Sequence, residues 1–148
     1  MSKPQVGNPF PHFILDCYSS KAGIEKIDSS SLAGKVFILA FYPKDSTPGC
    51  TKEMCAFRDD WSDFTNKGIE VFGISQDSIK SHESFSAKYE LASLKLLSDA
   101  EGTLSNDLSV GAELPKRTLF VIDKKGIIQK IIEGMPNNNE LLEFCKSL

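Results

Sequence analysis

Two cysteines five positions apart, Cys50 and Cys55, are the residues of this 148-residue sequence with the clearest capacity for chemistry. Cys50 follows the tripeptide TPG at residues 47–49, which is typical of a helix start because threonine is a good N-cap and proline suits the first helical position. A cysteine in the first turn of a helix faces unpaired backbone N–H groups and the positive end of the helix dipole. Both favour the thiolate, so Cys50 is predicted to be a nucleophile.

Cys55 lies on the same predicted helix but out of bonding range of Cys50. On an intact α-helix, two Cα atoms five residues apart are about 8.7 Å apart, from a rise of ~1.5 Å and a rotation of ~100° per residue at a radius of ~2.3 Å. A disulfide needs less than about 7 Å between its Cα atoms. If the two sulfurs bond, the first turns of the helix must unwind, which would couple oxidation to a local order–disorder step.

The elements around these cysteines are those of an α/β protein. Residues 36–42 (VFILAFY) and 69–75 (IEVFGIS) are continuous apolar runs typical of strands covered on both faces. The helix between them repeats apolar residues at three- and four-residue steps and ends near Gly68. The other expected elements are a hairpin from 13–15 and 24–27, a helix at 78–89, a strand at 95–97, a short helix at 103–108, a hairpin from 118–122 and 127–132, and a last helix beginning at 137–139.

Length and composition agree with a single domain over residues 1–148. The chain is 41% hydrophobic and 25% charged, which is typical of a globular protein. Alternating strands and helices followed by a hairpin predict a thioredoxin-like α/β sandwich. This fold would have a mixed central sheet, helices on both faces and an N-terminal hairpin extension.

Charge and hydropathy argue against two classes of partner. The net charge is −3 and no segment concentrates lysine and arginine, so nucleic-acid binding is not expected. The longest apolar run, residues 36–42, is far shorter than the ~20 residues of a membrane-spanning helix. Prolines and an aspartate stand where a signal peptide would have its apolar segment. We expect no membrane association and a cytoplasmic location.

Residues 41–59, FYPKDSTPGCTKEMCAFRD, resemble the active-site segment of the peroxiredoxins, specifically of the peroxiredoxin Q or bacterioferritin comigratory protein group. The family pattern is proline, three residues, threonine, two residues, cysteine. Pro43, Thr47 and Cys50 match it, and Cys55 matches the helix-borne resolving cysteine of this group. The resemblance covers nearly the whole chain.

Arg117 is the candidate cation for stabilising a thiolate at Cys50. It stands just before the expected strand at 118–122, and the strands of a wound sheet end near one another. It also matches the distal arginine of the peroxiredoxins, within KRTLFVIDKKG at 116–126. The preceding segment, residues 109–116, is shorter than in many members of the group.

The resemblance implies a thiol-dependent peroxidase acting on hydrogen peroxide and organic hydroperoxides. Cys50 would be oxidised to a sulfenic acid, which Cys55 would resolve as an intramolecular disulfide. Thr47, the backbone N–H of Cys50 and Arg117 would hold the peroxide oxygens, and Pro43 would shield the site from water. Thioredoxin or a similar dithiol protein would reduce the disulfide. No cofactor or metal is implied, and a monomer is expected, with a weak dimer as the alternative.

Two other functions are compatible with a cysteine pair. A thioredoxin-like disulfide oxidoreductase, the main alternative, would have two residues between its cysteines instead of four. A zinc-binding module would need four ligands, of which Cys50 and Cys55 supply two. His12 and His82 show no ligand-like spacing to a cysteine and are predicted to be surface or loop residues.

The remaining candidates are given structural roles. Cys17 and Cys145 are expected to pack as small hydrophobic side chains. Glu53 and Arg58 are expected to take part in charge pairing on the helix surface, which contributes little to stability.

Overall fold

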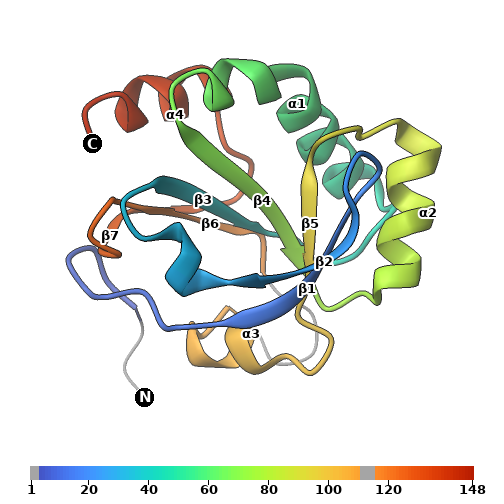
Figure 1. The fold of residues 1–148 in the computed structure, drawn as a ribbon, viewed down its shortest axis with the longest axis horizontal. Helices are drawn as coiled ribbons and strands as arrows, with labels where there is room; N and C mark the ends of the chain where they lie inside the picture. The colour runs from blue at the N-terminus through green and yellow to red at the C-terminus, as the bar shows by residue number, and fades with distance from the viewer. Residues whose placement is uncertain (1–3, 111–115) are drawn as a thin grey trace.

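The computed structural model describes residues 4–110 and 116–148, so most of the short segment before Arg117 lies outside it. Within these residues the chain forms a seven-stranded mixed sheet in the order β2-β1-β5-β4-β3-β6-β7 (Figure 1). The elements are β1 Ile14–Ser19, β2 Gly23–Asp28, the 3-10 helix η1 Ser29–Leu32, β3 Val36–Phe41, α1 Pro48–Thr65, β4 Ile69–Ser75, α2 Ile79–Tyr89, β5 Lys95–Ser98, α3 Thr103–Asp107, β6 Thr118–Ile122, β7 Ile128–Glu133 and α4 Asn138–Cys145.

Helices cover both faces of the sheet, as the sequence predicts. Alternate side chains of a strand point to opposite faces, and in β3 Ile38 and Ala40 pack with α1, α2 and α4, whereas Phe37 and Leu39 pack with α3 and η1. Figure 1 shows α1 and α4 together above the sheet and α3 below it. All six residues of β3 are buried, which confirms the prediction of a central strand.

The N-terminal hairpin extends the sheet instead of lying beside it. The expected short peripheral hairpin is two six-residue strands, β1 and β2. β1 also pairs with β5 in antiparallel fashion, with Cys17 opposite Leu97. This pairing is long-range and leaves little trace in local sequence, so the sequence predicts the hairpin but not its place in the sheet.

Close packing of α1 on the sheet depends on Gly73 in β4. A Cβ atom at this position would lie 2.6 Å from Met54 Sδ and 2.9 Å from Leu96 Cδ2. Its absence lets the middle of α1 approach the strand. The helix then ends before Gly68, whose φ of +74° turns the chain into β4. In the described ranges, none of the helices combines the length and apolarity needed to cross a bilayer.

Candidate active site

Cys50 lies where β3 passes into α1 through a short loop. It is the third residue of the helix, with Pro48 in the first turn, as the sequence predicts. The Cys50 side chain is fully buried. The positive end of the helix dipole therefore acts on this sulfur in a setting screened from bulk water.

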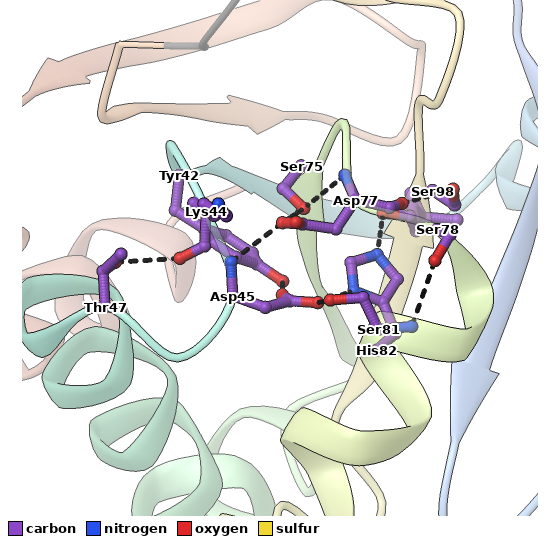
Figure 2. Close-up of polar contacts among 11 residues, drawn as sticks. Tyr42, Lys44, Asp45, Thr47, Ser75, Asp77, Ser78, Ser81, His82 and Ser98 are labelled. Atoms are coloured by element: carbon purple, nitrogen blue, oxygen red, sulfur yellow. Dashed lines mark hydrogen bonds and ion pairs between the residues drawn. The ribbon is translucent and has the colours of Figure 1, made fainter.

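Thr47 occupies the N-cap position of α1, but its hydroxyl does not cap the helix. The residue is extended, with φ −81° and ψ 152°, and makes no side-chain hydrogen bond to the first turn. Its Oγ1 instead donates to the carbonyl of Lys44 at 2.8 Å, as Figure 2 shows. The predicted position is confirmed, whereas the expected capping bond is replaced by one that closes the loop.

The structure brings Arg117 and Cys50 together. Arg117 Nη2 donates to Cys50 Sγ at 3.2 Å. β6 runs antiparallel to β3, with Thr118 opposite Phe41, so the start of β6 lies beside the end of β3. The predicted position of Arg117 near Cys50 is therefore correct. The reason differs, because the expectation rests on parallel strands, whereas β6 is antiparallel to β3.

Glu53 is part of the site and not of the helix surface. Its side chain is buried, and its Oε1 accepts from Arg117 Nη1 at 2.6 Å. Its Oε2 is buried without a hydrogen-bond partner among the described residues. The prediction of surface pairing for Glu53 is wrong because a guanidinium 64 positions away in sequence turns the carboxylate inward. Arg58 does stay near the surface, paired with Asp59 at 2.9 Å.

Burial sets the electrostatics of the Glu53–Arg117 pair. Loss of hydration raises the pKa of Glu53 to about 7, although the Arg117 charge and hydrogen bond oppose the shift. Burial also opposes the charge of Arg117, but the contacts with Cys50 and Glu53 outweigh it and raise the arginine pKa. Arg117 thus stays cationic beside the sulfur.

Gly49 provides the space that the Arg117 guanidinium occupies. A Cβ atom at Gly49 would lie 2.9 Å from Arg117 Nη2, the nitrogen that contacts Cys50. In the sequence, Gly49 is only part of the TPG tripeptide at the helix start. Its importance could not be found in the sequence, because it depends on a side chain from a distant strand.

Cys55 and Pro43 belong to the helix and the loop that carry Cys50. Cys55 is half-buried on α1 and, like Cys50, is a free thiol. The helix is continuous from Pro48 to Thr65, so the ideal separation of about 8.7 Å between the two cysteine Cα atoms applies. Pro43 is half-buried in the loop between β3 and α1.

Cys17 and Cys145 are buried in the core, as expected for packing residues. Burial raises the pKa of Cys17 to about 12 and that of Cys145 to about 11, so both are held as thiols. Across residues 4–110 and 116–148, no three His, Cys, Asp or Glu side chains cluster as metal ligands would.

The prediction that His82 is a surface or loop residue is wrong. Its side chain is fully buried, with Nδ1 2.7 Å from Asp45 Oδ2 and Nε2 2.9 Å from the Leu97 carbonyl. A lone histidine on a helix carries no sequence signal for such partners. His12, in contrast, has an exposed side chain that contacts Asp28.

Comparison with known proteins identifies the class that this fold and site represent. Residues 6–131 match the AhpC/TSA family model. AhpC from Enterococcus faecalis superposes with a TM-score of 0.88 at 20% identity, covering 96% of this chain and 90% of that one, which shows the fold. A mitochondrial 2-Cys peroxiredoxin from Plasmodium falciparum gives 0.88 at 28% identity, covering 97% and 93%. The chain belongs to the AhpC/TSA family.

Sequence relatives narrow this to a group within the family. The chain is 41% identical over 136 residues to the peroxiredoxin bcp of Coxiella burnetii, covering 86% of this chain and 87% of that protein. It is 40% identical over an alignment of 155 residues to a chloroplastic peroxiredoxin Q of Populus jackii, covering 99% and 70%. The protein is thus a peroxiredoxin of the Q/bcp type, which confirms the resemblance seen in the active-site segment.

Proposed function

We propose that this protein is a thiol peroxidase whose nucleophile is Cys50. The observation that carries the proposal is the 3.2 Å contact between Arg117 Nη2 and the Cys50 sulfur at the start of α1. A guanidinium and a helix N-terminus both stabilise negative charge, and they meet at one sulfur. This arrangement suits a thiolate that must attack a neutral hydroperoxide.

The first step needs the Cys50 thiolate, the hydroperoxide and one proton from water. The Cys50 thiolate attacks the terminal peroxide oxygen, an S–O bond forms and the O–O bond breaks. The sulfur is oxidised to a sulfenic acid, and the leaving hydroxide or alkoxide takes a proton to become water or an alcohol. Charge therefore moves from the sulfur onto the departing oxygen during the step.

Fixed donors can stabilise that moving charge without reorganising. Arg117 and the backbone N–H of Cys50 are the donors we assign to this role. Glu53 supports Arg117 by holding the second nitrogen of the guanidinium. The Thr47 hydroxyl donates its proton to the Lys44 carbonyl, so we assign it to accepting a hydrogen bond from the hydroperoxide O–H. We assign Pro43 to shielding Cys50 from water, since it is half-buried in the loop that leads from β3 into α1.

In the second step we assign Cys55 as the resolving cysteine. Its sulfur attacks the Cys50 sulfur, an S–S bond forms, and the S–O bond breaks to release water. Because the helical separation exceeds the reach of a disulfide, the first turns of α1 must unwind for the sulfurs to meet. The half-exposed position of Cys55 and the location of both thiols near the helix N-terminus favour this local opening.

The catalytic cycle closes by thiol–disulfide exchange with thioredoxin or a similar dithiol protein. The substrates in this proposal are hydrogen peroxide and organic hydroperoxides, the protein is a monomer, and its location is the cytoplasm. The Populus jackii relative is named as chloroplastic.

A coupled assay tests the proposal. The protein should consume hydrogen peroxide in the presence of thioredoxin, thioredoxin reductase and NADPH, and Cys50→Ser should abolish this consumption. Cys145→Ser is the matched control, because that buried thiol lies at the end of α4 and makes none of the hydrogen bonds of Arg117, and it should keep the activity. Reduction of insulin disulfides without peroxide consumption would instead support the disulfide oxidoreductase.

A further inference from the structure

A buried polar cluster surrounds Asp45, in the loop that joins β3 to α1. Asp45, at its centre, is 6% exposed. Oδ1 accepts from the Tyr42 hydroxyl at 2.6 Å, and Oδ2 accepts from Ser81 Oγ at 2.8 Å and contacts His82 Nδ1 at 2.7 Å. Figure 2 shows these groups converging on Asp45 from Tyr42, the residue after β3, and from the first turn of α2.

His82 ties this carboxylate to the sheet. Its Nε2 lies 2.9 Å from the carbonyl of Leu97 in β5, and a carbonyl can only accept, so Nε2 carries a proton. Its Nδ1 lies 2.7 Å from Asp45 Oδ2. His82 therefore links the carboxylate of the loop to the backbone of β5 through its two ring nitrogens.

The backbone of Asp45 has its own anchor. Its N–H donates to Asp77 Oδ2 at 2.8 Å, and the same oxygen accepts from Ser75 Oγ at 2.6 Å. The Asp77 carbonyl accepts from Ser98 Oγ at 2.6 Å. The Asp45 carboxylate is therefore held by Tyr42 and the first turn of α2, and its amide by Asp77 in the loop between β4 and α2. Ser75 of β4 and Ser98 of β5 hold Asp77 in turn.

The chain needs such anchoring because the next residue is strained. Ser46 has φ +63°, a left-handed conformation that a residue with a Cβ adopts only at a cost of about 1–3 kcal/mol and keeps where its surroundings enforce it. This turn redirects the chain so that Thr47 starts α1. Thr47 closes the loop from the other side through its bond to Lys44.

We propose that Asp45 and His82 are positioning residues that clamp the β3–α1 loop and so fix Thr47 and the Cys50 N–H for attack on the peroxide. The inference rests on the proposed function of Cys50. The clamp lies before the helix, so it holds the loop while the first turns of α1 unwind for the resolving step. Loosening it should therefore slow the reaction with peroxide without slowing disulfide formation.

The hydrogen bonds of this network indicate that it holds the loop in a defined geometry and does not only fill space. Burial and the neighbouring Asp45 charge raise the pKa of Tyr42, so its hydroxyl stays a donor to the carboxylate. The groups that face His82 and Asp45 from the surrounding elements are the Tyr42 hydroxyl, the Asp77 carboxylate and the Ser81 hydroxyl, all of which have hydrogen-bond partners. An apolar core could fill the same volume but could not hold a strained loop in one register.

Two variants of different severity test the clamp. His82→Gln removes the imidazole that links Asp45 to the backbone of β5, and Tyr42→Phe removes a single bond from Asp45 while keeping its own ring. The matched control is Ser105→Ala, which deletes a buried 2.7 Å bond to Asp99 at the start of α3, outside the loop network. The measurements are rapid-quench mass spectrometry of Cys50 oxidation and of the disulfide step with hydrogen peroxide, together with Tm.

We expect His82→Gln to lower the second-order rate constant for Cys50 oxidation by about tenfold to a hundredfold, and Tyr42→Phe to lower it by a smaller factor. The disulfide step should proceed at the wild-type rate or faster. Ser105→Ala should lower Tm without changing either rate. Oxidation within twofold of wild type in both clamp variants, or equal slowing of both steps, would overturn the inference. Failure of wild-type Cys50 to react would instead refute the proposed function.

Discussion

Buried Glu53 and partly buried Arg117 form a pair in which the carboxylate binds the guanidinium nitrogen that does not contact the nucleophile. Glu53 Oε1 accepts from Nη1 at 2.6 Å, while Nη2 donates to Cys50 Sγ at 3.2 Å. Glu53 thus orients the planar guanidinium through one nitrogen, while the other nitrogen contacts the nucleophile. A flexible ammonium group offers no equivalent fork.

Arg117→Lys should therefore impair the reaction with peroxide although it keeps the charge. Loss of one fixed donor to a developing negative charge typically costs about 10²–10³-fold in rate. Stopped-flow measurement of Cys50 oxidation by hydrogen peroxide checks this. Arg58→Lys, on the same helix as Cys50 but paired with Asp59, is the control and should react like wild type. Equal rates for Arg117→Lys and wild type would contradict the assigned role.

The burial of Glu53 should make stability depend on pH. The ordinary pKa of 4.5 applies to the unfolded chain, and burial raises it to about 7 in the fold. Between these values the folded state binds more protons than the unfolded state, so the free energy of unfolding falls as pH rises. The pKa difference corresponds to a loss of up to about 3 kcal/mol, complete above pH 7.

Glu53→Gln should remove this component of the pH profile. Urea unfolding at several pH values between 4.5 and 8 measures it, and the variant should gain stability relative to wild type as pH rises. Glu83→Gln, at an exposed position of α2, should leave the wild-type slope in place. Parallel profiles for wild type and Glu53→Gln would show that the buried carboxyl does not titrate in this range.

Gly49→Ala should slow the reaction with peroxide without lowering the stability of the fold. The added Cβ would lie 2.9 Å from Arg117 Nη2, and because that nitrogen ends a flexible side chain, the guanidinium can shift away at little cost. Alanine also favours the helix more than glycine does. We expect an unchanged or raised Tm with Cys50 oxidation slowed by about tenfold or more. A lower Tm with an unchanged rate of Cys50 oxidation would show that the added Cβ clashes with a group other than the Arg117 guanidinium.

Local sequence patterns are sufficient to predict most of the fold. The apolar repeat of α1, with TPG at its start and Gly68 beyond its end, predicts the helix that carries Cys50, and β6 is predicted over its observed length. Such elements are specified within a few residues of sequence. The pairing of β1 with β5 joins distant segments, and only the folded sheet reveals it.

The burial of certain polar residues could not be predicted from the sequence. Glu53 and His82 have the sequence character of solvent-exposed helix residues, yet both are buried because their partners come from distant segments. Arg117 lies 64 positions from Glu53, and Asp45 lies 37 positions from His82. A buried charge is stable only with its partner present, so neither position can be inferred without the tertiary structure.

Cys55→Ser should separate the two chemical steps. Cys50 should still react once with peroxide at close to the wild-type rate, and turnover with thioredoxin should then stall at the sulfenic acid or at an intermolecular disulfide. Rapid-quench mass spectrometry and the coupled assay together measure both phases. Full steady-state turnover of this variant through thioredoxin would rule out Cys55 as the resolving residue.

The most direct test of the account is mass spectrometry of the intact protein and its peptides after one equivalent of hydrogen peroxide is added to the reduced chain. The account predicts the loss of two hydrogen atoms and a peptide link between Cys50 and Cys55, which also requires the start of α1 to unwind. A link to Cys145 or a stable sulfenic acid on Cys50 would contradict the resolving step. An unchanged mass would contradict the peroxidase itself.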